Sequence, residues 1–255
     1  MINSEICATA LEIQSKYRNR SPEEILAFFL KRHPNRIALA SSLGAEDQVL
    51  TDMILKIDPC ARIFTLDTGR LPQETYAAIG ATMRHYGIRF EIYFPQTQAV
   101  EALEREFGPD LFYESLAKRK QCCRIRKLEP LQRALRTLDV WIAGLRRAQS
   151  ATRTVIEKIE WDDVNQKIKL NPLADWSADQ VWQYIRQHKV PYHALHDRGF
   201  PSIGCAPCTR AVRPGEDLRS GRWWWETSET KESEAPPKEC GLHYQDGKLV
   251  RRSPA

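Results

Sequence analysis

Residues 36–47 read Arg-Ile-Ala-Leu-Ala-Ser-Ser-Leu-Gly-Ala-Glu-Asp, a short apolar run that ends in two serines and a glycine. The apolar part predicts a buried strand, and the spacing of apolar residues from 49 to 57 predicts a helix directly after the loop. Such a strand–turn–helix presents backbone N–H groups and serine hydroxyls to an anion, with Gly44 allowing a tight turn. An ordinary capped turn is the alternative, and no Gly-Lys-Ser/Thr sequence of a Walker A loop follows. We expect phosphate contacts from Ser41, Ser42, Gly44, Ala45, Glu46 and Asp47.

Strands and helices alternate along the rest of the chain. We expect helices over 21–31, 72–86, 98–107, 124–138 and 177–188, strands over 61–66, 88–94 and 140–143, and a polar hairpin over 154–170. Alternating strands and helices predict an α/β fold, an open parallel sheet flanked by helices on both faces. We expect one α/β nucleotide- and cluster-binding domain over residues 1–210, followed by a flexible C-terminal segment over 211–255.

Two more strand ends carry polar residues. Leu66-Asp-Thr-Gly-Arg70 ends one predicted strand, and Gly144-Leu-Arg-Arg147 follows another. Ligands of open parallel sheets collect at the carboxyl ends of the strands, and three such ends suit a nucleotide. The arginines would offset phosphate charge, and a structural salt bridge is the alternative for each one. The predicted contacts are Leu66, Asp67, Thr68, Arg70, Gly144, Arg146 and Arg147.

Four of the seven cysteines form two close pairs, Cys122 with Cys123 and Cys205 with Cys208. The chain start lacks the pattern of a signal peptide, so we expect a cytoplasmic protein whose cysteines serve metal binding or catalysis rather than disulfides. Four thiolates from two short loops suit zinc or a 4Fe–4S cluster. Adjacent cysteines favour the cluster, because their diverging side chains can bind separate iron atoms. Zinc and uncoordinated thiols are the alternatives.

Composition describes a soluble globular protein, with 42% hydrophobic residues and a net charge of +5. No apolar run is long enough to span a bilayer, so no membrane partner is expected. Between Lys118 and Arg136 there are eight lysines and arginines against one acid, Glu129. This stripe suits a nucleic acid, a nucleotide or an anionic thiolate cluster, and a solvated helix face is the alternative.

The C-terminal part contains a cysteine apart from the two pairs. Cys240 lies in Lys-Glu-Cys-Gly-Leu-His, residues 238–243, after a stretch from 226 to 239 that holds five glutamates and two lysines. The acidic stretch cannot bury much apolar surface, so it predicts a mobile tether. Cys240 is free to act as a nucleophile, and His243 is either its hydrogen-bond or proton donor or a solvated tail residue.

Six motifs together resemble the assimilatory adenylyl-sulfate (APS) reductases, over most of the chain from Ser41 onward. They are SSLGAED (41–47), LDTGR (66–70), KRKQCCRIRK (118–127), GLRRAQS (144–150), GCAPCTR (204–210) and ECGLH (239–243). The resemblance implies a fold shared with ATP pyrophosphatases and the reduction of adenosine 5′-phosphosulfate to sulfite and AMP, in sulfate assimilation and cysteine biosynthesis. One departure is Leu43, where the family often has a second serine, so one phosphate donor is missing or is supplied by Ser42.

The resemblance also implies roles for single residues. Cys240 attacks the sulfate sulfur and becomes S-sulfocysteine, and thioredoxin or a glutaredoxin-like protein then releases sulfite. The phosphosulfate would be surrounded by Lys127, Arg219, Arg222 and His243. The 4Fe–4S cluster is expected to order the loop that carries Lys127 rather than to carry electrons. Because the chain lacks the fused thioredoxin-like domain of plant enzymes, the reductant should be a separate protein.

Three other functions remain open at this point. The related 3′-phosphoadenylyl-sulfate (PAPS) reductases usually lack both cysteine pairs, so the pairs favour APS, although PAPS use or dual use is the main alternative. An ATP pyrophosphatase or tRNA-thiolating enzyme would use the same fold. A cluster-based redox sensor would need a DNA-reading helix or dimer motif, and neither is visible, so no nucleic-acid partner is expected. A monomer and a homo-oligomer are both compatible with the sequence.

Overall fold

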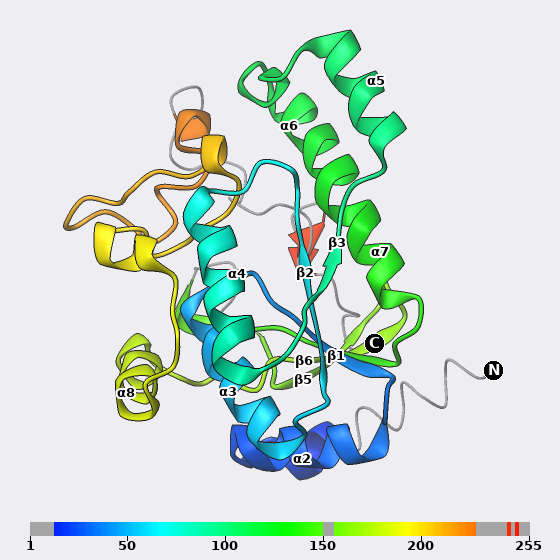
Figure 1. The fold of residues 1–255 in the computed structure, drawn as a ribbon, viewed down its shortest axis with the longest axis vertical. Helices are drawn as coiled ribbons and strands as arrows, with labels where there is room; N and C mark the ends of the chain where they lie inside the picture. The colour runs from blue at the N-terminus through cyan, green and yellow to red at the C-terminus, as the bar shows by residue number, and fades with distance from the viewer. Residues whose placement is uncertain (1–12, 150–155, 228–243, 246–247, 250–255) are drawn as a thin grey trace.

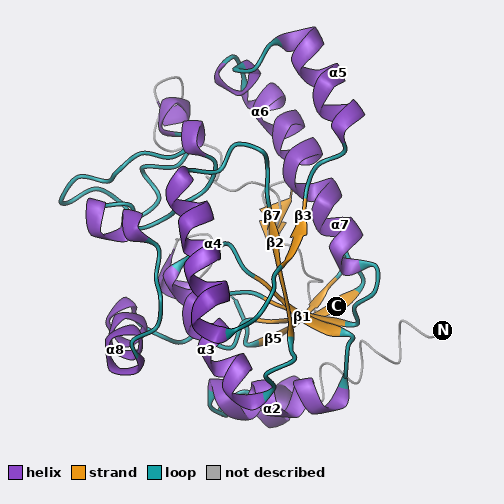
Figure 2. Ribbon diagram, in the orientation of Figure 1, coloured by secondary structure: helices purple, strands orange, loops and turns teal. Residues whose placement is uncertain are grey.

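The structure is a computed structural model that describes residues 13–149, 156–227, 244–245 and 248–249. Its centre is a six-stranded sheet with the order β3-β2-β1-β4-β6-β5. All neighbouring strands are parallel except β5, which is antiparallel to β6 (Figures 1 and 2). The predicted α/β class with a largely parallel sheet is therefore confirmed. The strands are β1 (Ile37–Ala40), β2 (Arg62–Leu66), β3 (Glu91–Tyr93), β4 (Val140–Ile142), β5 (Ile159–Asp162) and β6 (Lys167–Leu170).

Helices cover both faces of the sheet (Figure 1). The long ones are α2 (Pro22–Arg32), α3 (Ala45–Ile57), α4 (Gln73–Tyr86), α5 (Thr97–Phe107), α6 (Leu116–Cys123), α7 (Glu129–Leu135) and α8 (Ala178–His188). The shorter elements are η1 (Leu111–Tyr113), η2 (Arg124–Leu128), η3 (Arg147–Gln149), η5 (Ala194–Arg198), η6 (Ala206–Cys208), η7 (Trp224–Thr227), and the pair β7 (Tyr244–Gln245) and β8 (Lys248–Leu249). Within the described residues, no helix is long and apolar enough to cross a membrane.

Successive strand residues point to opposite faces of the sheet, and each face is buried under helices. Ile37 and Leu39 of β1 pack in the core with α2, α3 and α8. Ala38, between them, packs with Phe64, Trp141 and the buried face of α7. A strand buried on both faces needs an unbroken apolar sequence, which is why Ile-Ala-Leu-Ala predicted β1 correctly.

The helix starts follow from local capping. Ser21 accepts a hydrogen bond from the backbone N–H of Glu24, whose side chain accepts one from the Ser21 N–H, and Pro22 occupies the first turn. Ser177 and Gln180 form the same reciprocal pair at the start of α8. Such caps satisfy N–H groups that have no partner inside the helix. They account for the accuracy of the predictions over 21–31 and 177–188.

The hairpin over 154–170 is confirmed as a hairpin, but its polar character was misread. β6 pairs with β4, so the hairpin extends the main sheet, and all four residues of β5 are buried. Lys169 lies with its ammonium 3.7 Å from a Glu160 carboxylate oxygen and 5.2 Å from the centre of the Trp141 ring. Lys169 and Glu160 of this segment are therefore paired inside the protein, which the sequence alone could not indicate.

The helix predicted over 124–138 begins earlier, at Leu116, where the Ser115 hydroxyl accepts the N–H of Lys118. Cys122 and Cys123 therefore lie in the last turn of α6, inside a continuous helical segment and not in a short loop. The helix continues through η2, a π-helical stretch over Arg124–Leu128, into α7. The error has a clear cause, because Leu-Ala-Lys-Arg-Lys-Gln-Cys-Cys lacks the apolar periodicity of an amphipathic helix. π-helical turns inside α-helices are frequent at functional sites.

Candidate active site

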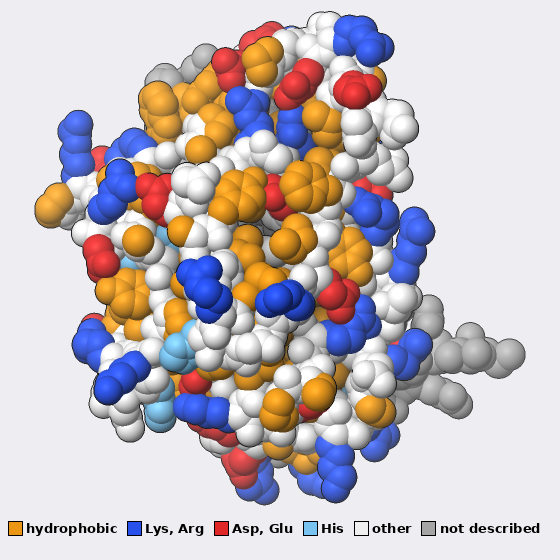
Figure 3. Space-filling view, in the orientation of Figure 1, with side chains coloured by type: hydrophobic (Ala, Val, Ile, Leu, Met, Phe, Trp, Pro, Cys, Tyr) orange, Lys and Arg blue, Asp and Glu red, His pale blue; other side chains and the backbone are white. Residues whose placement is uncertain are grey.

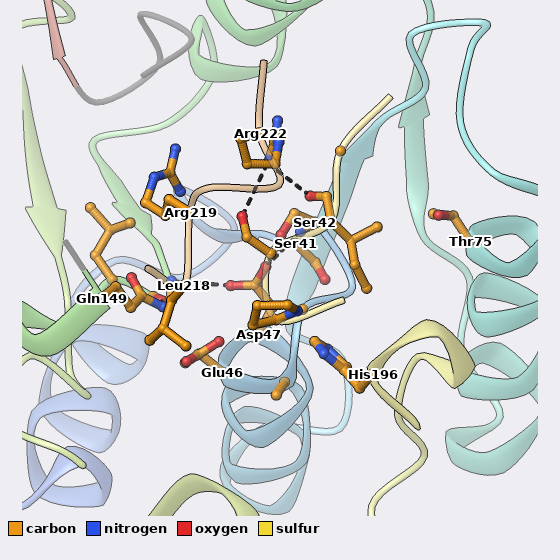
Figure 4. Close-up of a pocket in the computed structure, with 18 of the residues that line it drawn as sticks. Ser41, Ser42, Glu46, Asp47, Thr75, Gln149, His196, Leu218, Arg219 and Arg222 are labelled. Carbon is orange, nitrogen blue, oxygen red and sulfur yellow. Dashed lines mark hydrogen bonds between the residues drawn. The ribbon is translucent and has the colours of Figure 1, made fainter. Parts of the chain in front are cut away.

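A cavity of about 680 Å³ lies at the carboxyl ends of β1, β2 and β4, where the sequence predicted a ligand (Figure 4). Most of the predicted phosphate and nucleotide contacts line it. These are Ser41, Ser42, Gly44, Ala45, Glu46, Asp47, Leu66, Thr68, Lys127, Gly144, Arg146, Arg219 and Arg222. The remaining predicted contacts, Asp67, Arg70 and Arg147, do not line this cavity.

Asp47 fastens the loop between β1 and α3 to the end of β4. Its carboxylate accepts hydrogen bonds from the backbone N–H of Ser42 at 2.7 Å, the Ser42 hydroxyl at 2.6 Å and the Gly144 N–H at 3.1 Å. Burial raises the pKa of Asp47 to about 6, although the bonds from Ser42 and Gly144 oppose this shift. The loop between β1 and α3 is therefore shaped by the hydrogen bonds of Asp47.

Gly44 does not make the tight turn that we expected of it. It has φ −64° and ψ 164°, an extended conformation open to any residue, and it is the N-cap of α3. The left-handed residue is Leu43, with φ 62°. This conformation costs a non-glycine residue about 1 kcal/mol, and the complete burial of the Leu43 side chain in the core offsets the cost.

Gly144 is the glycine on which the loop depends. A Cβ at this position would overlap the Asp47 Oδ1 atom and lie 2.9 Å from the Glu46 Cβ and 3.1 Å from the Asp47 backbone nitrogen. We expect Gly144→Ala to lower the free energy of unfolding by about 2 kcal/mol, as overpacking does. Gly44→Ala is the matched control, since its nearest neighbour would be 3.5 Å away. Urea denaturation measures both, and equal stabilities would contradict this account.

Both predicted phosphate-binding arginines that follow β4, Arg146 and Arg147, are engaged in ion pairs. The Arg146 guanidinium lies 2.7 Å from a Glu46 carboxylate oxygen and also donates to the Trp176 carbonyl, so the pair forms part of the cavity floor. Arg147 donates to the Ile156 carbonyl and pairs with Glu157 and Asp175. The salt-bridge alternative therefore holds for Arg147, and Arg146 is shared between Glu46 and the cavity.

Asp67 and Arg70 lie beside the cavity and organise the end of β2. Asp67 accepts the Gly69 N–H at 2.8 Å and the Tyr76 hydroxyl at 3.0 Å. The Arg70 guanidinium lies 4.9 Å from the centre of the Phe112 ring and pairs with Asp110 at 3.3 Å. Arg70 lines the neighbouring cysteine cavity instead of the large one.

Positive charge gathers at one end of the large cavity. Lys127 and Arg222 are 8% and 6% exposed, and Arg219 lies beside Arg222 (Figure 4). Arg222 donates to the Ser202 hydroxyl at 3.2 Å and the Ile203 carbonyl at 3.3 Å, which are neutral acceptors. With respect to the part of the chain that the structure describes, its positive charge is therefore left for an anionic ligand. Cations held in a half-enclosed cavity bind phosphate and sulfate groups strongly.

Sequence reasoning missed several lining residues, which, apart from Gln149 of the GLRRAQS motif (144–150), come from segments without a recognisable motif. Among them are Thr75, Gln149, Trp182, His196, Ser202 and Leu218. His196 belongs to η5, which Thr75 helps to hold through His193. The His193 Nδ1 atom accepts the Leu195 N–H at 3.2 Å, so Nε2 carries the proton and donates to the Thr75 hydroxyl at 2.9 Å. No spacing in the sequence relates Thr75 to His193.

The His193 ring gives a pH-dependent stability. Burial, followed by the charge of His196, lowers its pKa from 6.5 to about 4. The folded state therefore resists protonation of His193. The stability that the neutral His193 ring contributes is present above pH 6.5 and is lost as the pH falls to 4. We expect the stability difference between wild type and His193→Gln to shrink by about 2 kcal/mol from pH 7 to pH 4. Denaturation at both pH values tests this, with the exposed His85→Gln as control; a constant difference would contradict it.

A second, much smaller cavity of about 10 Å³ is lined by all four predicted metal ligands, Cys122, Cys123, Cys205 and Cys208. All four thiols are buried and free. Lys127 and Cys205 line both cavities, so the two are immediate neighbours. The sequence prediction that the two cysteine pairs meet is therefore correct.

The surroundings of the four thiols suit a negatively charged group. Arg70, Arg119, Arg126 and Lys127 line the same cavity. Burial opposes ionisation of Cys205, but the positive charge of Lys127 and the Thr68 hydroxyl, 3.3 Å from its Sγ, outweigh burial and lower its pKa. The buried N–H groups of Trp223 (Nε1) and Arg126 (Nε) have no hydrogen-bond partner among the described residues. Unused donors of this kind fit the sulfur atoms of a cluster.

No three ligand-type side chains in the described ranges lie close enough together to hold one metal ion. Thiols that share a cavity without closing on one point do not fit tetrahedral zinc as they stand. A polynuclear cluster places each thiolate on its own iron atom and tolerates wider spacing. The donor set and its cationic surroundings fit a 4Fe–4S cluster better than a single zinc ion.

Some of the basic side chains between residues 118 and 136 are buried and point into the protein. Arg119, Arg126 and Lys127 are 1%, 5% and 8% exposed, and all three line the cysteine cavity. Figure 3 shows lysines and arginines spread over the visible face among hydrophobic and acidic side chains, without one basic patch. The inward cations match the interpretation that the stripe serves an anionic centre.

Cys240 and His243, the predicted catalytic residues, lie outside the described residues, as does most of the predicted tether. We expected the whole tether to be mobile, but its first residue, Glu226, is held in place. The Glu226 carboxylate lies 2.8 Å from the Arg119 guanidinium, and its side chain is only 10% exposed. Residues 211–226 fold back over 199–210, where Thr209 and Arg222 form a β-bridge. The described chain therefore stays attached to the site through Glu226.

Comparisons with known proteins agree with this geometry. The model of the phosphoadenosine phosphosulfate reductase domain matches residues 36–211. An adenosine 5′-phosphosulfate reductase of Allochromatium vinosum is 53% identical over 84% of this chain and 81% of its own length. The crystal structure of a phosphoadenylyl-sulfate (PAPS) reductase from Candida auris superposes with a TM-score of 0.68 at 27% identity, covering 80% of this chain and 96% of that one. An FMN adenylyltransferase of Candida glabrata shares the fold alone. It superposes with a TM-score of 0.52 at 16% identity, covering 91% of this chain and 84% of its own. The chain is a member of the phosphoadenosine phosphosulfate reductase domain family.

Proposed function

We propose that this protein reduces adenosine 5′-phosphosulfate to sulfite and AMP. One observation carries the proposal: a nucleotide-sized cavity ends in Lys127, Arg219 and Arg222, directly beside a cavity lined by four cysteines. The cationic end suits the phosphosulfate, and the loop held by Asp47 suits the nucleotide. The relative from Allochromatium vinosum bears the name of this activity.

The first chemical step is the attack of the Cys240 thiolate on the sulfate sulfur. A bond forms between the Cys240 sulfur and the sulfate sulfur, and the bond from that sulfur to the phosphate oxygen breaks. AMP leaves with the electron pair of the broken bond, and Cys240 becomes S-sulfocysteine. His243, three residues further along the chain, is proposed to donate a hydrogen bond or proton at this step.

In the second step a thiolate of thioredoxin attacks the Cys240 sulfur and releases sulfite. The second thioredoxin thiol then resolves the mixed disulfide, so thioredoxin is oxidised by two electrons and Cys240 is restored. Both electrons come from thioredoxin, or from a glutaredoxin-like protein. A reducing cytoplasm would keep the reductant active, and the five cysteines in the described ranges are all free thiols. Whether one copy or a homo-oligomer acts does not alter this chemistry.

The cations contribute most when charge moves. As the S–O bond breaks, negative charge grows on the phosphate of the departing AMP, and Arg219 and Arg222 are placed to offset it. The Arg222 guanidinium packs closely against Gly204, where a Cβ would overlap its Nη2 atom. Pre-positioned charges of this kind lower a barrier without reorganisation during the reaction.

We further propose that Cys122, Cys123, Cys205 and Cys208 hold a 4Fe–4S cluster. When bound, the cluster would supply a buried negative charge and a covalent link between α6 and η6. Lys127, which lines both cavities, would then be held between that charge and the phosphosulfate. The fixed position of Lys127 is the benefit for catalysis, because it orients a cation toward the substrate.

The substrate test compares APS with PAPS. Protein purified without oxygen is mixed with thioredoxin and either nucleotide, and sulfite is measured. We expect turnover with APS to exceed that with PAPS at least about tenfold. Turnover with PAPS alone would move the assignment to the other branch of the family. ATP-dependent pyrophosphate release without sulfite would instead support an ATP pyrophosphatase.

A further inference from the structure

The segment from Arg219 to Glu226 joins the two cavities. Arg219 and Arg222 line the large cavity, and Trp223 lines the cysteine cavity. The backbone N–H of Trp223 donates to the Cys208 carbonyl at 3.3 Å, and Trp223 has φ 43°, in the left-handed region. A bulky residue adopts such a conformation only where its surroundings force it to. Something must therefore hold this segment in place.

Arg119 is the strongest anchor of the segment. Arg119 is 1% exposed, and its guanidinium forms a two-fold ion pair with Glu226, from Nε to Oε1 at 2.8 Å and from Nη2 to Oε2 at 3.1 Å. The same guanidinium lies 4.4 Å from the centre of the Trp223 ring. Arg119 stands one helical turn before Cys123 and interacts with its thiol. A bidentate pair of this kind fixes direction as well as distance.

The contacts continue from Trp223 to the substrate cavity. The Arg222 guanidinium lies 4.8 Å from the centre of the same ring. Two guanidinium groups on one ring repel each other unless one charge is offset. Glu226 offsets the charge of Arg119, whereas Arg222 donates to the neutral Ser202 and Ile203 and keeps its charge for the cavity.

We propose that Arg119 and Glu226 are positioning residues for Arg222. They fix Trp223, and through it they hold the Arg222 guanidinium at the wall where the phosphosulfate of the proposed reaction binds. Neither residue lines the large cavity, so neither is a substrate contact. The identity of the ligand in this inference rests on the proposed function. The structural part, the positioning of Arg222, does not.

The ligand part is tested in a Cys240→Ser background, in which APS binds without turnover. We expect Glu226→Gln to raise the dissociation constant for APS about tenfold, because the buried guanidinium of Arg119 then loses the carboxylate that fixes its direction and Arg222 shifts. Arg119→Lys keeps the positive charge but loses the two-fold geometry of the ion pair. It should therefore retain APS binding only in part. The control is Glu91→Gln, which breaks another bidentate pair, with Arg62, remote from both cavities. It should leave the dissociation constant unchanged.

The structural part has its own measurement, hydrogen exchange of the backbone amides from 219 to 226. We expect Glu226→Gln to speed exchange of the Arg222 and Trp223 amides, while the strands of the sheet remain protected. Unchanged exchange in this segment overturns the inference, whatever the ligand result. If exchange rises but the Cys240→Ser parent does not bind APS, the proposed function fails and the positioning role stands. Accelerated exchange with an unchanged dissociation constant would refute the link to Arg222.

Discussion

Cys240→Ser is expected to abolish sulfite release, by at least about 10³-fold, and to leave APS binding within about twofold. A serine hydroxyl ionises far less readily than a thiol, and it forms no bond that thioredoxin can cleave to release sulfite. The two effects separate because the cations that we assign to substrate binding, Lys127, Arg219 and Arg222, belong to other segments. Sulfite release with saturating thioredoxin measures the first effect, and calorimetric titration with APS measures the second.

Mass spectrometry identifies the intermediate itself. Wild-type protein incubated with APS and no reductant should gain the mass of one SO₃ group on the peptide that contains Cys240. The Cys240→Ser protein should gain none. Cys60→Ser is the matched control, because Cys60 is an exposed free thiol that lines neither cavity, and this variant should still be sulfonated at Cys240. Sulfonation elsewhere, or normal turnover by Cys240→Ser, would refute the assignment of the nucleophile.

Local patterns predicted most of the fold. Buried parallel strands need unbroken apolar runs, and capped helices need Ser, Pro and Glu at fixed offsets, so both leave a readable trace. The convergence of three strand ends followed from the rule that parallel strands present their carboxyl ends at one edge. Ser41, Ser42, Gly144 and Leu66 line one cavity for this reason.

The errors concern interactions between distant residues. Arg119 and Glu226 are 107 positions apart, and nothing near Glu226 distinguishes it from the other glutamates of the acidic stretch. The left-handed turn falls on Leu43 instead of Gly44, because core packing outweighs the local preference for glycine. Arg147 follows a strand end yet turns to Glu157 and Asp175. In each case the decisive partner is supplied by tertiary structure.

Cys123→Ser is expected to remove the cluster and most of the activity together. With one thiolate lost, iron content should fall from about four atoms per chain to below one, and the brown colour should disappear. Arg70, Arg126 and Lys127 would then line a cavity that lacks the negative charge of the cluster, although Arg70 and Arg126 keep their ion pairs with Asp110 and Glu104. We expect Lys127 to shift and the rate of sulfite release to fall at least about 100-fold, because a 1 Å misplacement has an effect of this size.

Cys60→Ser again serves as the control and should retain iron and activity. A general loss of fold is separated from loss of the cluster by the far-ultraviolet circular dichroism spectrum, since the six-stranded sheet and its core involve none of the four cysteines. If the cluster only orders the cationic cavity, an iron-free Cys123→Ser protein keeps its folded spectrum and binds APS weakly. Full activity in that colourless protein would show that Lys127 needs no such support, and the proposed role of the four thiols would be wrong.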